Sequence, residues 1–133
     1  MRDSKPRVVV ADDHPGMLDA VMNLLQCNGY NVIAAVRDGE SALHAVIDFD
    51  PDLTVLDISM PRMDGLAAGQ AIRRRGLKTK IIFLTIQSGP EYVEAARALD
   101  AGYVVKSQLY SDLLPTMADW LAKDIPARQT VSS

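Results

Sequence analysis

Cysteine is almost missing from this chain: Cys27 stands alone among 133 residues. A single cysteine excludes an internal disulfide and every metal site built from several thiolates, and its place in an apolar helical pattern suggests a core filler. No apolar run is long enough to span a bilayer, and no signal-peptide pattern is visible. We therefore expect a soluble, cytoplasmic domain.

Positive charge is not in excess either. The 14 Lys and Arg residues stand against 17 Asp and Glu residues, which gives a net charge of −3. A surface of this balance is not expected to hold a nucleic acid unaided. The basic run Arg73-Arg74-Arg75 closes a predicted helix, where solvated cations favour the helix dipole.

Short apolar runs alternate with segments of helical periodicity along the chain. We predict strands at residues 7–11, 30–36, 53–56, 80–86 and 103–105. In the fourth of these, Thr85 is taken as the polar residue at the strand end. Helices follow each strand, with Pro15 at a first helical position and caps at Asp38 and Asp64. Five such repeats predict an α/β fold, a single doubly wound parallel sheet of the flavodoxin type with strand order 2-1-3-4-5.

The last helix and the end of the chain complete the domain. Because proline is tolerated only in a first helical turn, Pro115 predicts that this helix begins around Ser111 or Asp112. Residues 1–122 would form the folded domain. Residues 123–133 are polar and without periodicity, which predicts a flexible tail or the start of a linker.

The central feature is the buried run of residues 53–56, which ends at one carboxylate, Asp57. In open parallel sheets the carboxyl ends of the strands carry the ligand site, so Asp57 lies where chemistry is expected. The alternative is that Asp57 merely begins a turn, as many aspartates do.

Each predicted strand end adds a polar group at that same edge. These groups are Asp12 and Asp13 after the first strand, then Asp57, Thr85 and Lys106. Converging carboxylates repel unless a cation intervenes, and oxygen ligands beside a phosphate position suit Mg²⁺. With an ordinary pKa near ~3.9, Asp57 would be anionic at neutral pH and could attack a phosphoryl group without a general base.

These motifs together resemble the receiver domain of two-component response regulators, over about residues 6–122. The resemblance is carried by Asp12-Asp13, Asp57-x-x-Met60-Pro61-x-Met63-Asp64-Gly65, Thr85, and Gly102-Tyr103-x-x-Lys106. Asp12-Asp13-His14-Pro15 and Lys106-Ser107 are similar to the NarL-like branch, in which the receiver usually precedes a helix-turn-helix DNA-binding domain.

The resemblance implies a phosphorylation switch with Asp57 as the phospho-acceptor. Asp13, Asp57 and the backbone carbonyl of Ser59 would bind Mg²⁺, with Asp12 acting through a water. Thr85 and Lys106 would hold the phosphoryl oxygens, and Tyr103 would be the switch aromatic. The implied partners are a sensor histidine kinase and a second copy of the chain, with DNA bound only through an output domain absent here.

Three positions depart from the family pattern. Ile86 follows Thr85 where a small residue is general in the family, which suggests either narrower access to Asp57 or a restricted Thr85 side chain. Lys106-Ser107 lacks the proline that often follows this lysine. The connection at residues 99–102 is about one residue shorter than usual and has no glycine to end the preceding helix.

Two other function classes remain open beside the switch. One is an aspartyl-nucleophile phosphohydrolase of the haloacid-dehalogenase type, although Ser59 occupies the place of its second aspartate. The other is an interaction module of the same fold that no longer accepts phosphate, as Ile86 suggests. Among single residues, His14 is interpreted as a turn or packing residue, Trp120 as packing on the sheet, and Met17, Met22 and Met117 as core fillers.

Overall fold

The structure, a computed structural model, describes residues 5–86 and 89–123. Within them, five parallel strands form one sheet in the order β2-β1-β3-β4-β5. Their bounds are β1 Arg7–Ala11, β2 Asn31–Val36, β3 Leu53–Asp57, β4 Lys80–Thr85 and β5 Gly102–Val105. The predicted fold class and strand order are confirmed. The predicted tail lies largely outside the described residues.

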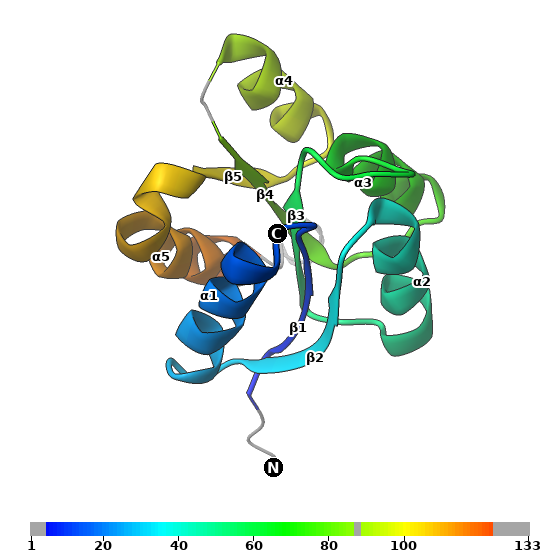
Figure 1. Cartoon of the computed structure of the whole chain (residues 1–133). Helices are drawn as coiled ribbons and strands as arrows, with labels where there is room; N and C mark the ends of the chain where they lie inside the picture. Colours follow the sequence, from blue (N-terminus) through cyan, green and yellow to red (C-terminus); the bar gives the residue numbers. More distant parts are fainter. Residues whose placement is uncertain (1–4, 87–88, 124–133) are drawn as a thin grey trace, which may run out of the picture.

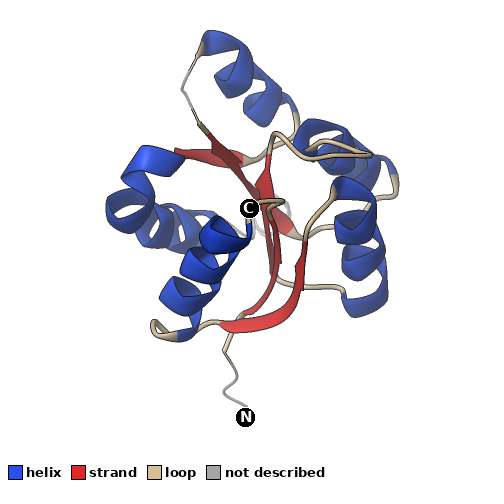
Figure 2. Cartoon of the chain, viewed as in Figure 1, coloured by secondary structure: helices blue, strands red, loops and turns tan. Residues whose placement is uncertain are grey.

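Helices cover both faces of the sheet (Figures 1 and 2). α1 (Pro15–Gln26) and α5 (Leu109–Ala122) cover one face, and α2 (Gly39–Phe49), α3 (Gly65–Arg74) and α4 (Pro90–Ala98) cover the other. Alternate residues of each central strand enter opposite cores: Leu84 packs with α1 and α5, whereas Phe83 packs with α2 and α3. This double coverage explains why β3 is buried throughout.

The predicted helix starts are confirmed at the sheet edge that carries Asp57. The side chain of Asp38 accepts a hydrogen bond from the amide of Ser41 at 2.7 Å, and that of Asp64 accepts one from Ala67 at 2.8 Å. Pro15 occupies the first position of α1. These caps satisfy amides that would otherwise lack partners and fix where each loop ends.

The predicted start of the last helix was wrong. α5 begins at Leu109, directly after a short 3-10 helix (η1, Lys106–Gln108), so Pro115 lies well inside α5. Proline in a helix interior costs about 3 kcal/mol. The earlier start is favoured because it carries Leu109 into the core, one turn before Leu113 and two before Met117.

Cys27 and Arg73 also differ from their sequence interpretations. Cys27 is exposed at the end of α1 and fills no core.

Arg73 is partly buried, and its Nε donates a hydrogen bond to the carbonyl of Leu99 at 2.8 Å. Its Nη1 donates to the carbonyls of Leu77 at 3.0 Å and Thr79 at 2.8 Å. Burial lowers the pKa of Arg73. One of the three cations is thus a structural tie between α3, β4 and the end of α4.

The short connection before β5 ends its helix without glycine. Asp100 takes the left-handed conformation, with φ of 54°, and the amide of Ala101 donates to the carbonyl of Ala96 at 2.9 Å. Aspartate tolerates this conformation better than most residues. The missing glycine is therefore replaced by an aspartate in the same role.

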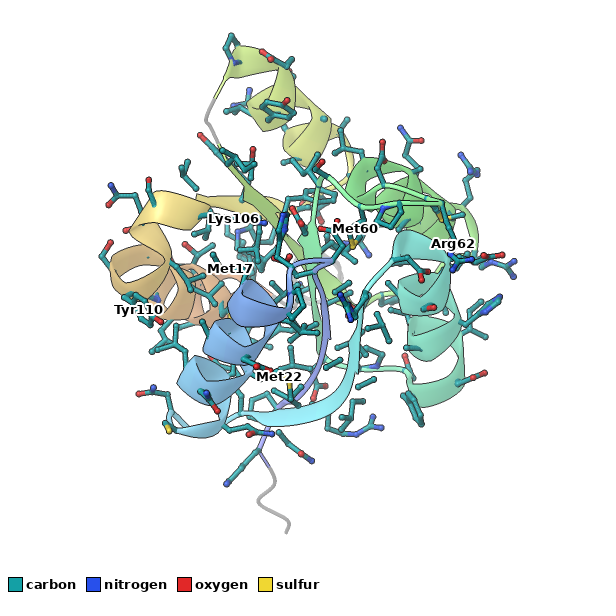
Figure 3. The ribbon with its side chains drawn as sticks, viewed as in Figure 1. Met17, Met22, Met60, Arg62, Lys106 and Tyr110 are labelled. Carbon is teal, nitrogen blue, oxygen red and sulfur yellow. The ribbon has the colours of Figure 1, made fainter. Side chains whose placement is uncertain are left out.

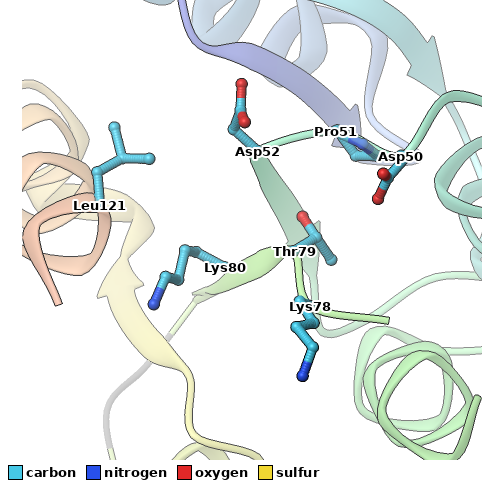
Figure 4. Close-up of a pocket in the computed structure, with 7 residues that line it drawn as sticks. All are labelled: Asp50, Pro51, Asp52, Lys78, Thr79, Lys80 and Leu121. Atoms are coloured by element: carbon cyan, nitrogen blue, oxygen red, sulfur yellow. The ribbon is translucent and has the colours of Figure 1, made fainter. Parts of the chain in front are cut away.

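A cavity of about 250 Å³ lies where β3 and β4 begin, at the opposite end of these strands from Asp57. Figure 4 shows the residues that line it. It is lined by Asp50, Pro51, Asp52, Lys78, Thr79, Lys80 and Leu121. The Asp52 side chain accepts from the amide of Arg7 at 2.8 Å, and the Arg7 guanidinium donates to the carbonyl of Asp50 at 3.2 Å. Asp50 and Asp52 therefore help to join the starts of β1 and β3.

Over the described ranges, no helix is both long and apolar enough to cross a membrane.

Candidate functional site

Three carboxylates meet where β1 and β3 end. Asp12 and Asp13 follow β1 directly, and Asp57 is the last residue of β3. One carboxylate oxygen from each, together with a nitrogen of His14, lie within 4.8 Å of one another. Asp12 is fully buried and Asp57 is 1% exposed. The convergence predicted from the strand ends is confirmed.

Lys106 supplies the positive charge of this cluster. Its Nζ lies 3.1 Å from Oδ2 of Asp12 and 3.1 Å from Oδ2 of Asp57, and its side chain is only 10% exposed. In Figure 3, Lys106 lies between α5 and Met60 of the β3–α3 loop. β5 and η1 therefore hold the ammonium against two buried carboxylates.

The pKa of Asp57 differs from the sequence expectation. Burial, followed by the nearby charge of Asp12, raises the pKa of Asp57 from 3.8 to about 6, although contact with Lys106 lowers it in part. Asp57 is thus still ionised above neutral pH, but at a cost to the folded state. One lysine does not offset three clustered carboxylates.

The donor set fits a hard divalent cation. Oδ2 of Asp12 and Oδ2 of Asp57 are buried and pair with Nζ of Lys106, and the buried Oδ1 of Asp13 faces the imidazole of His14. Each of these oxygens keeps a lone pair that can coordinate an ion. The amide of Ser59 donates to Oδ1 of Asp57 at 3.2 Å, which fixes the rotamer of Asp57. Coordination of Mg²⁺ by the backbone carbonyl of Ser59 stays a prediction.

A cavity of about 250 Å³ opens onto Asp57, lined by Asp57, Ile58, Ser59, Thr85, Ile86 and Tyr92. Thr85 is buried at the end of β4, as expected. Ile86 is 68% exposed, so its apolar side chain lies at the rim of this cavity and not in its floor. Tyr92, from α4, was missed, because no motif in the sequence marks it.

Tyr103 lies apart from the carboxylates. It is half-buried on β5 and lines a separate cavity between α4 and α5 that also contains Val93, Arg97 and Trp120. Trp120 itself packs on the α1–α5 core, with its indole beside Gly102. Met117 is fully buried, and Met17 and Met22 are partly buried against the same core, as predicted.

Comparison with known proteins gives the family. Residues 8–118 match the response regulator receiver domain. The chain belongs to the response regulator receiver family. This receiver is 33% identical over 128 residues to an uncharacterised transcriptional regulatory protein, YvfU, of Bacillus subtilis, covering 95% of the chain and 62% of that protein. It is 32% identical over 117 residues to the probable transcriptional regulatory protein NarL of Mycobacterium tuberculosis, covering 86% of the chain and 54% of that protein.

Solved structures agree with the fold. The signal receiver domain of the putative response regulator NarL from Mycobacterium tuberculosis superposes with a TM-score of 0.85 at 30% identity. That match covers 90% of this chain and 98% of the other. The receiver spans a little over half the length of the curated relatives named above.

Proposed function

We propose that this receiver is a phosphorylation switch that accepts a phosphoryl group on Asp57. The observation that carries the proposal is the contact of Oδ2 of Asp57 with Nζ of Lys106 at 3.1 Å, beside Asp12 and Asp13. An anionic nucleophile with a fixed cation at hand, at the floor of an open cavity, suits attack on phosphorus.

The transfer conserves atoms and charge in a simple way. An oxygen of Asp57 forms a bond to phosphorus while the bond from phosphorus to the donor breaks, and the donor leaves with its electron pair. For a histidine kinase the donor is a phosphohistidine nitrogen; for a small donor it is a carboxylate oxygen. Mg²⁺ held by Asp13, Asp57 and the Ser59 carbonyl, with Asp12 through a water, would neutralise the phosphoryl oxygens. Lys106 and Thr85 would bind those oxygens.

The output is proposed to follow from the added charge. A phosphoryl group adds about −1 to −2 at the end of β3, which would draw Thr85 towards it and let Tyr103 move inward. The surface of α4, β5 and α5 would change, and with it self-association. We infer that the receiver is cytoplasmic, that its partner is a sensor histidine kinase, and that it forms a homodimer on phosphorylation. Control of transcription would act through a DNA-binding domain outside this chain. The only reactions that the receiver itself would catalyse are the phosphorylation and dephosphorylation of Asp57.

Intact mass after incubation with acetyl phosphate tests the proposal. We expect a Mg²⁺-dependent gain of one phosphoryl group in the wild type, no gain in Asp57→Asn, and an unchanged gain in Asp48→Asn, whose carboxylate is exposed on α2. A wild-type chain that binds Mg²⁺ but gains no mass would favour the interaction module instead. Catalytic release of phosphate from unrelated esters would favour the phosphohydrolase.

The rate of that reaction should depend on Ile86. We expect Ile86→Ala to accept phosphate from acetyl phosphate several-fold faster than the wild type, because the substitution removes an apolar side chain from the rim of the Asp57 cavity. Ile47→Ala, a matched change of an exposed isoleucine on α2, should leave the rate unchanged. Equal rates for Ile86→Ala and the wild type would show that the rim does not limit access.

A further inference from the structure

A histidine stands beside the three carboxylates. Nδ1 of His14 lies 3.1 Å from Oδ1 of Asp13 and 3.4 Å from Oδ1 of Asp12. The amide of His14 donates to Oδ1 of Asp12 at 2.9 Å, and the residue forms the N-cap of α1. The sequence interpretation as a turn residue holds, but the 62% exposed imidazole is not a packing residue.

The spacing of these atoms matches a coordination shell. Zn²⁺ binds nitrogen and oxygen ligands at ~2.0–2.2 Å, which places neighbouring ligand atoms roughly 3–4 Å apart. The contact of 3.1 Å between His14 and Asp13 falls in that range. The whole set of four ligand atoms spans 4.8 Å, so modest side-chain rotation would bring them onto one ion.

The charge and the buried oxygens point the same way. Asp12 and Asp57 each bury an Oδ2 whose partner is Nζ of Lys106, and Asp13 buries an Oδ1 that faces the imidazole of His14. Within the described cluster, Lys106 offsets only part of three carboxylate charges. The cluster therefore favours a further cation, and the identity of its ligands decides which.

Ligand type separates the metals. Three carboxylates alone suit Mg²⁺, which takes oxygen and retains waters, whereas an imidazole nitrogen raises affinity for Zn²⁺ and other divalent transition metals. We propose that His14 is a fourth protein ligand for a transition-metal ion such as Zn²⁺, which binds at the acidic cluster in competition with Mg²⁺. Such an ion would exclude the Mg²⁺ that supports phosphoryl transfer, and with four protein ligands it would leave no open position for a phosphoryl oxygen.

This proposal uses the carboxylates of the proposed function, but its first readout does not depend on phosphorylation. The chain contains two histidines, His14 and His44, and His44 is exposed on α2. In ¹⁵N NMR of the full chain, Zn²⁺ should strongly displace the Nδ1 resonance of His14 and leave that of His44 in place. Mg²⁺ should displace the Nδ1 resonance of His14 much less, because it would act on the ring only through Asp13, and it should leave that of His44 in place. A His14 ring that does not respond to Zn²⁺ would overturn the proposal.

A pair of variants gives the energetic test. His14→Asn retains a good N-cap, so the fold should be kept, and His44→Asn is the matched control. We expect Zn²⁺ affinity, measured against a chromophoric chelator, to fall about tenfold or more in His14→Asn, with Mg²⁺ affinity unchanged in both variants. Equal Zn²⁺ affinity in the wild type and His14→Asn would contradict the assignment.

The two proposals can fail separately. In the wild type, Zn²⁺ should suppress the Mg²⁺-dependent mass gain from acetyl phosphate, and in His14→Asn the same Zn²⁺ concentration should suppress a smaller fraction of that variant's own Zn²⁺-free gain. If Zn²⁺ binds through His14 but neither the wild type nor His14→Asn gains a phosphoryl group, the phosphorylation proposal fails and the metal site stands. If mass is gained and Zn²⁺ suppresses it equally in both proteins, the role of His14 is refuted.

Discussion

Asp57→Asn should be more stable than the wild type at pH 7.5 without divalent cations, by up to about 3 kcal/mol, which corresponds to an increase in Tm of up to roughly 10 °C. The pKa of Asp57 is 3.8 ordinarily and about 6 in the folded chain. Its contribution to stability is therefore complete below about pH 3.8 and is lost as the pH rises through about 6. Asparagine removes the buried charge that causes this loss.

Thermal unfolding at two pH values and with Mg²⁺ checks the cause. The difference in Tm between Asp57→Asn and the wild type should shrink as the pH is lowered from 7.5 to 5, because folded Asp57 is mostly protonated at pH 5. Millimolar Mg²⁺ should raise the Tm of the wild type and narrow the difference. Asp48→Asn, on the exposed face of α2, should match the wild type throughout. An Asp57→Asn protein less stable than the wild type at pH 7.5 would contradict the argument.

Gly65→Ala should destabilise the chain by about 3 kcal/mol, near the upper end for overpacking a close contact. A Cβ at this first residue of α3 would lie only 2.2 Å from the backbone carbonyl oxygen of Asp57. The amide of Gly65 also donates to the carbonyl of Ile58 at 2.8 Å, so α3 cannot withdraw without losing that bond. Urea unfolding should show the loss, and Mg²⁺ affinity should fall with it.

Gly16→Ala is the matched control, since Gly16 lies in the first turn of α1 and a Cβ there would meet no atom within 4 Å. We expect it to be neutral or to stabilise by about 0.5 kcal/mol, as alanine favours helices over glycine. If both alanine variants behaved alike, the close approach at Gly65 would not be the cause of the loss.

Local pattern predicted most of the fold. The buried run of Val8, Val9 and Val10 and the cap at Asp38 require no tertiary information, and parallel topology then brings Asp57 to Lys106. The errors arose where distant contacts outweigh local preference. Burial of Leu109 extends α5 ahead of Pro115, and Arg73 looks solvated until the carbonyl of Leu99 is placed beside it. A lone histidine carries no ligand signal before its neighbours are known.

The tie made by Arg73 has a mechanical consequence for α4. The only residue of this helix that is fully enclosed is Ala96, near its C-terminal end, and the next turn, at Leu99, is fixed to α3 and β4 through the guanidinium. The N-terminal end, which carries Tyr92 to the Asp57 cavity, has no comparable anchor among the described contacts. Among the described contacts, the C-terminal end of α4 is therefore held more firmly than its N-terminal end.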